Sequence, residues 1–68
     1  MSKGALKLIE VRKELGLTQH DLSVKTNIKR NTIASIEAGI NSPSVKTAKV
    51  LGDYLNFDWT LFFEEGEE

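Results

Sequence analysis

The sequence predicts an all-α fold, a compact bundle of five helices around a central helix-turn-helix. Apolar residues recur at helical spacing in several short segments, and residues that cap or end helices stand between these segments. Between Leu17 and Gly39, two short helical patterns are separated by a break of only a few residues. Two short helices joined by so tight a turn are typical of a helix-turn-helix.

The first two helices are expected over residues 5–15 and from about 19 to 26. An apolar stripe marks the inner side of the first: Leu8, Val11 and Leu15. Thr18 should cap the second helix, in an imperfect capping box with Asp21. Asn27 should end it, because asparagine tolerates the left-handed conformation that a sharp turn needs.

The third helix is expected from about Arg30 to Ala38. Ile33 and Ile36 define its inner side, so the residues that point outward are Asn31, Ala34, Ser35 and Ala38, with Arg30 on the flank. Lys29 stands at the cap position, where a lysine cannot cap and its charge opposes the positive helix end. A nearby anion would explain such a residue.

A fourth helix should follow the cap Ser44 and end near Asn56. Its expected inward residues are Val45, Ala48, Leu51 and Leu55. Gly52 inside this helix indicates that another helix crosses too closely for a side chain. Asp58 should cap a fifth, short helix from Trp59 to about Phe63.

Length and composition restrict the classes of function. Residues 1–68 should form one domain, with an ordered core over about 5–63 and an acidic tail at 64–68. A domain this small buries only about 60% of its unfolded surface, so a core and an active-site cleft are hard to combine. The chain has no cysteine and one histidine, His20, which argues against disulfides, metal sites and catalytic triads. We expect no enzyme activity, no metal and no cofactor.

The chain also lacks an apolar run of signal-peptide or membrane-spanning length. With no cysteine, this indicates a soluble cytoplasmic protein without a membrane partner. No small-molecule ligand is expected either.

Charge is divided unevenly along the sequence. Residues 1–49 contain all nine lysines and arginines and four acids, a formal charge of +5. Residues 50–68 contain six acids and no base, a formal charge of −6. Scattered surface charge is the plain alternative, but such separation favours one face that meets phosphate and another that does not.

In the helix-turn-helix and around it, the sequence resembles the Cro and phage-repressor (XRE-like) family of DNA-binding regulators, found in prokaryotes and phages. The residues that carry the resemblance are Arg12, Gly16-Leu17-Thr18-Gln19, Leu22, Ile28, Thr32-Ile33, Ile36-Glu37, Gly39 and Asn41-Ser42-Pro43-Ser44. They span roughly residues 6–63. The resemblance implies a lambda-repressor-like DNA-binding domain.

By resemblance, Arg30, Asn31 and Ser35 occupy the positions that read bases in this family. Their chemistry agrees, because arginine forks onto guanine, asparagine pairs with adenine and serine can take either role. Ala34 could lie against a thymine methyl group. The plain alternative is a solvated helix face.

The candidate phosphate contacts are Gln19, Lys29, Thr18 and Arg12. Gln19 resembles the family residue that binds a phosphate at a helix N-terminus. Thr18 is better explained as a cap and His20 as a surface residue. Arg12 and Glu37 resemble the family pair that joins the first helix to the recognition helix, and the alternative is two separate surface charges.

Large apolar residues crowd the C-terminal end: Phe57, Trp59, Leu61, Phe62 and Phe63. A short helix can turn only one stripe inward, so some of these side chains should stay exposed. We expect a homodimer interface that contains Phe57, Trp59, Phe62 and Phe63. A two-fold dimer would match a palindromic operator, with its recognition helices about 34 Å apart. The alternative is that the aromatics close the core of a monomer.

The function expected is that of a sequence-specific, double-stranded DNA-binding transcriptional regulator, a repressor that occupies an operator with its third helix in the major groove. The alternative is a protein-interaction module, such as an antitoxin-like or adaptor protein, that uses the C-terminal aromatics. Salt separates the two, because phosphate binding weakens steeply with salt and an apolar interface does not.

Overall fold

The computed structural model describes residues 1–64, within which lie four α-helices and one 3₁₀ helix. The α-helices are α1 (Lys3–Glu14), α2 (Gln19–Thr26), α3 (Arg30–Glu37) and α4 (Val45–Leu55), and the 3₁₀ helix is η1 (Trp59–Phe63). The all-α class is confirmed, and η1 stands where the fifth helix was expected. Most of the acidic tail, residues 65–68, lies outside the described residues.

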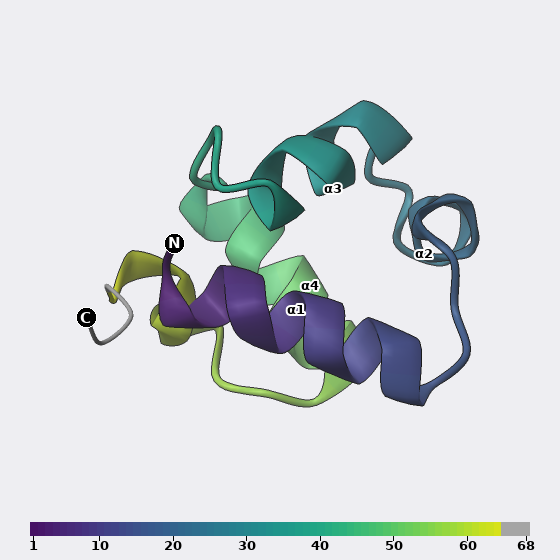
Figure 1. Ribbon diagram of the computed structural model, residues 1–68, viewed down its shortest axis with the longest axis horizontal. Coiled ribbons are helices and arrows are strands. Elements are labelled where there is room, and N and C mark those ends of the chain that lie inside the picture. The colour runs from purple at the N-terminus through teal and green to yellow at the C-terminus, as the bar shows by residue number, and fades with distance from the viewer. Residues whose placement is uncertain (65–68) are drawn as a thin grey trace.

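The helices surround one small core (Figure 1). α2 and α3 form the helix-turn-helix, and α3 contacts α1 as well as α2. After α4 the chain turns back, so that η1 packs against α1 and α4 and lies beside the N-terminus. The Lys3 backbone N–H donates to the Glu64 carbonyl at 2.8 Å, which joins the two ends of the described chain.

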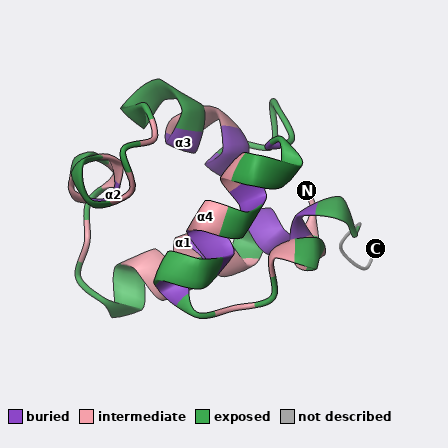
Figure 2. Cartoon of the chain, turned by 180° about the vertical axis from the view of Figure 1, so that it is seen from behind, coloured by how far each residue is buried: buried purple, intermediate pink, exposed green. Residues whose placement is uncertain are grey.

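The core takes residues from every helix. Its buried members are Leu8, Leu22, Ile33, Ile36, Ala48, Leu51, Leu55 and Phe62. In α1, α3 and α4 they lie on the sides that face one another, while most of the outer surface is exposed (Figure 2). α3 is therefore held from behind by apolar packing, and its outer side stays open.

The expected helix ends are confirmed by local geometry. Thr18 and Asp21 form a full capping box at the start of α2, and the Thr18 N–H bond lowers the pKa of Asp21 below its ordinary value. Asn27 and Asn56 both have left-handed backbones, with φ of 60° and 63°. Ser44 caps α4.

Two apolar residues expected in the core lie on the surface. Leu15 is 56% exposed because it caps the end of α1, where the chain turns away at Gly16 with a φ of +71°. Val45 is 51% exposed because it is the first residue of α4, at the edge of the buried side. Ala5 and Pro43 are buried instead, and α1 begins two residues earlier than expected because Ser2 caps it.

The C-terminal aromatics also require a correction. Phe62 was expected in a dimer interface, but its side chain is 1% exposed and belongs to the core. It packs against Phe57 with ring centroids 5.6 Å apart. The tight turn of η1 directs Phe62 inward and Phe63 outward, so a free surface cannot contain both.

Gly52 lies where the chain returns from α4 to η1. A Cβ atom at this position would lie 2.7 Å from the Phe57 carbonyl oxygen and 2.8 Å from Trp59 Cβ. The close neighbour is thus the turn into η1 rather than a crossing helix. Because this neighbour includes backbone, it cannot move aside as a flexible side chain would.

Gly52→Ala should therefore lower the free energy of unfolding by about 1–3 kcal/mol through overpacking, although alanine favours a helix by about 1 kcal/mol. Urea unfolding followed by circular dichroism measures the change. Asp53→Ala is the matched control, because Asp53 is exposed on the same helix and should change stability by no more than about 0.5 kcal/mol. A Gly52→Ala variant as stable as the wild type would contradict the close approach.

Candidate nucleic-acid interface

The outer side of α3 carries the side chains expected to read bases. Arg30 and Asn31 are exposed, and Ala34 and Ser35 are half-buried. Ile33 and Ile36 hold the opposite side in the core, as expected. The outer face formed by Asn31, Ala34 and Ser35 carries only small or polar side chains. An approaching surface can therefore come close to the helix backbone.

The turn before α3 has two local features. Ser23 of α2 donates its hydroxyl proton to the Ile28 carbonyl at 2.5 Å, which ties the turn to the helix before it. Lys29 precedes α3 and makes no side-chain capping bond, as its residue type predicted. The first N–H groups of α3 therefore have no side-chain cap, and the exposed cation of Lys29 lies next to them.

Arg12 and Glu37 lie together between α1 and α3. Arg12 Nε donates to Glu37 Oε2 at 2.7 Å, and Nη2 donates to Oε1 at 3.0 Å. The side chains are only 11% and 7% exposed. The hydrogen bond to Glu37 raises the pKa of Arg12 above its ordinary value, so the guanidinium stays charged. A forked pair of this kind fixes both the distance and the angle between its helices.

Gln19 connects α2 to the same carboxylate. Its Nε2 donates to Glu37 Oε1 at 2.9 Å. An amide nitrogen carries two protons, so one remains for another acceptor. The neighbouring Thr18 hydroxyl accepts the Asp21 N–H and keeps its own proton. Both candidate phosphate contacts thus have a fixed position and a free donor.

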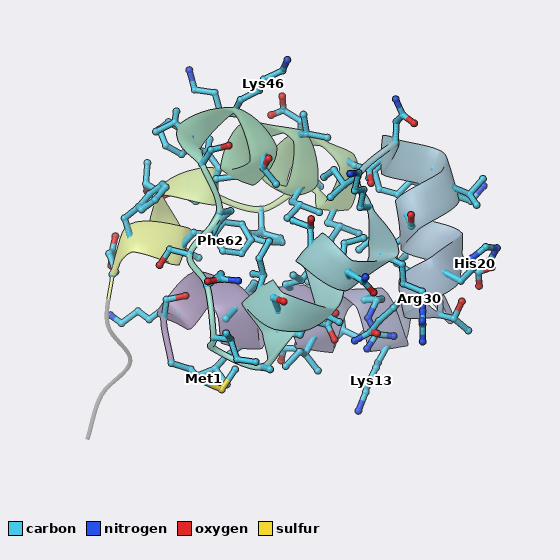
Figure 3. All side chains as sticks on the ribbon, turned by 90° about the horizontal axis from the view of Figure 1, so that it is seen from above. Met1, Lys13, His20, Arg30, Lys46 and Phe62 are labelled. Carbon is cyan, nitrogen blue, oxygen red and sulfur yellow. The ribbon has the colours of Figure 1, made fainter. Side chains whose placement is uncertain are left out.

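A hollow of about 530 Å³ lies between the end of α1, the start of α2 and the start of α3. Arg12, Lys13, His20 and Arg30 line it, and no acidic residue does. Figure 3 shows Lys13, His20 and Arg30 at the same end of the molecule. The sequence did not single out Lys13, because only the packing of α1 against α3 brings it to the same hollow as Arg30.

The remaining members of the expected dimer interface lie at the other end of the chain. Phe57 and Trp59 are half-buried, and Phe63 is 49% exposed. The Trp59 and Phe63 rings meet edge to face at 6.2 Å, and Lys49 Nζ lies 5.2 Å from the centre of the Trp59 ring. η1 packs on α1 and α4, so these aromatics are separate from the outer side of α3.

Two further features concern residues 1–64. No group of three or more histidine, cysteine, aspartate or glutamate side chains there could hold a metal ion. None of the helices in this part of the chain is long and apolar enough to cross a membrane.

The sequence of this chain matches the model of the helix-turn-helix family HTH_3 over residues 8–62, which is most of its length. The chain belongs to this family. The expected family is therefore confirmed, and the matched residues run from the middle of α1 to the buried Phe62 of η1.

Relatives of this helix-turn-helix chain occur in distant organisms. The HTH-type transcriptional regulator YqaF of Bacillus subtilis (strain 168) is 43% identical over 54 residues, 79% of this chain and 71% of that protein. An HTH-type transcriptional regulator of Methanothermobacter thermautotrophicus is 45% identical over 61 residues, 84% of this chain and 88% of that protein.

A solved structure has the same fold. The crystal structure of an HTH_3 family transcriptional regulator from Vibrio cholerae superposes with a TM-score of 0.77 and 27% identity. The match covers 91% of this chain and 35% of that one, so this chain spans about a third of that protein's length.

The buried ion pair gives the second prediction. Arg12→Met and Glu37→Gln should each lower the free energy of unfolding by about 3 kcal/mol, because each leaves a buried partner without its counterpart. The double variant should cost less than the sum, with a coupling energy of about 1–3 kcal/mol from a double-mutant cycle.

The matched control is the Lys7–Glu10 pair of α1, whose atoms are 3.3 Å apart but whose side chains are 44% and 57% exposed. Its cycle (Lys7→Met, Glu10→Gln) should give at most about 0.5 kcal/mol. If the two cycles give equal coupling energies, burial contributes nothing to the Arg12–Glu37 interaction.

Proposed function

We propose that this protein is a sequence-specific, double-stranded DNA-binding transcriptional regulator, which places α3 in the major groove. The observation that carries the proposal is the exposed outer side of α3, where Arg30 and Asn31 stand beside the smaller Ala34 and Ser35. A major groove about 12 Å wide admits one helix, and these residue types suit guanine, adenine and thymine edges. Membership of the HTH_3 family supports the same conclusion.

In this proposal, phosphates of one strand bind at the hollow between α1 and α2. Gln19 and Thr18 supply free donors beside the N-terminus of α2, and Arg12 adds a charge. Lys29, in the turn before α3, supplies a further charge for a backbone phosphate outside this hollow. Among the described residues no acidic side chain lines this hollow, and the Glu37 carboxylate that binds Arg12 and Gln19 is buried, which supports this assignment.

The regulator would act as a repressor, by occupying a palindromic operator in the cytoplasm as a homodimer. The support for the dimer is the exposed Phe63 ring, which meets the half-buried Trp59 ring edge to face. Contiguous exposed apolar surface of this kind is a mark of protein–protein interfaces. A two-fold pair would set two α3 helices about 34 Å apart, the distance between successive major-groove turns.

Base reading by α3 is the third prediction. Arg30→Ala and Asn31→Ala should each cost about 1–3 kcal/mol of binding at particular base positions of a motif selected from random duplex DNA. Lys29→Ala should instead weaken all sequences alike, because it removes a phosphate contact. A motif and affinity unchanged in Arg30→Ala and Asn31→Ala would show that other residues read the bases. Binding that is insensitive to salt would favour the protein-interaction module.

The dimer gives the fourth prediction. Sedimentation equilibrium at micromolar concentration should give twice the 7.6 kDa chain mass for the wild type and the single mass for Phe63→Ala. Phe63 is the residue to change because Phe62 is in the core, where alanine would unfold the protein. Tyr54→Ala, an exposed aromatic on α4, is the control and should remain a dimer. A monomer mass for the wild type would exclude the dimer in free solution.

A further inference from the structure

A second hollow lies on the other side of α3, between the α2–α3 turn and the first half of α4. Its volume is about 400 Å³. Two lysines line it, Lys29 from the turn and Lys46 from α4, together with the hydroxyl residues Thr32 and Thr47. No acidic side chain contributes to its wall, so the hollow is open to an anion.

Both lysines are exposed, and neither forms an ion pair with any residue of the described chain, 1–64. Lys29 also places its charge at the positive end of α3. Two cations beside one hollow repel each other weakly in water, and an anion between them removes that repulsion. The tertiary fold is what brings them together, since they are far apart in the sequence.

A polar hollow of about 370 Å³ adjoins this one and shares Thr32 and Thr47 with it. Among the described residues it is lined by amide and hydroxyl residues, such as Asn41 and Ser44, and by the apolar Ile36 and Pro43, with no charged side chain. Amides and hydroxyls are common donors to DNA phosphate and sugar oxygens. The α4 side of α3 thus offers several hydrogen-bond donors, with two lysines at one end.

The position of α3 indicates which DNA strand supplies the phosphates that each hollow would bind. Seen from above, the ribbon of α3 lies between α1 and α4, with Lys13 on the α1 side and Lys46 on the α4 side (Figure 3). A helix about 10–12 Å across fills the major groove, and one sugar-phosphate backbone runs along each edge of that groove. The two sides of α3 therefore face different strands.

We propose that the hollow lined by Lys29 and Lys46 binds a backbone phosphate of the second DNA strand, opposite the strand held beside α1 and α2. Lys46 is a phosphate-contact residue that neither the sequence pattern nor the family resemblance assigned. The inference rests on the proposed function, because it takes α3 to lie in the major groove. With this contact, the interface has basic groups at both edges of the major groove.

The test is the salt dependence of binding to the selected duplex. Lys46→Gln keeps the length of the side chain and removes its charge, so the slope of log affinity against log salt should become less steep by about 0.9. Between 50 and 200 mM salt, the wild type should then lose about 3.5-fold more affinity than the variant. The preferred sequence should stay the same, because no base contact is removed.

Lys49→Gln is the matched control, one turn further along α4. The Lys49 Nζ atom lies over the Trp59 ring, on the side of η1, so this variant should keep the wild-type slope. Methylphosphonate substitution of single phosphates within one half-site of the selected motif then assigns the strand. We expect sensitive phosphates on both strands of that half-site for the wild type, and only those of the second strand should become insensitive in Lys46→Gln.

An unchanged slope in Lys46→Gln, or an equal change in Lys49→Gln, would overturn the inference and leave the proposed function standing. Sensitive phosphates on only one strand of a half-site would do the same. If the wild type selected no motif, the proposed function would fail, and the slopes on unselected duplex would still decide whether Lys46 binds phosphate. A wild type that bound no duplex DNA would overturn both.

Discussion

The position of α3 depends on one buried carboxylate. Glu37 of α3 accepts two hydrogen bonds from Arg12 of α1 and one from Gln19 of α2. Burying a charged group costs several kcal/mol in lost hydration, which is offset only while its donors stay in place. Apolar packing of Ile33 and Ile36 attracts α3 to the core but has no preferred direction. The carboxylate supplies that direction, because its hydrogen bonds fix where α3 lies relative to both neighbouring helices.

The short C-terminal helix η1 completes the hydrophobic core, which the four α-helices do not close by themselves. Phe62 fills the core between α1 and α4, and the Lys3–Glu64 backbone bond holds η1 beside the first turn of α1. A domain of this size has few buried residues, so one phenylalanine is a large share of its apolar stabilisation. The same turn leaves Phe63 outside. Two neighbouring residues of η1 therefore have different roles: Phe62 closes the core, and Phe63 lies on the proposed dimer surface.

Basic and acidic side chains are also separated in space. The hollows on the two flanks of α3 are lined by bases and neutral donors, whereas Asp53, Asp58 and Glu64 lie in α4 and around η1. Hydrogen bonds from Thr60 lower the pKa of Asp58 below its ordinary value, so this acid stays ionised. A chain with almost no net charge can thus present a positive side to phosphate and a negative side away from it.

The sequence alone determined the helix ends and the outer side of α3, because caps, left-handed asparagines and helical periodicity act over a few neighbouring residues. Thr18, Asn27, Ser44 and Asn56 are examples. Only the tertiary structure decided which of Phe62 and Phe63 is buried, that Leu15 and Val45 are exposed, and that Gln19 binds Glu37. It also brought Lys46 beside Lys29. These outcomes depend on contacts between residues far apart in the chain, and local periodicity carries no information about them.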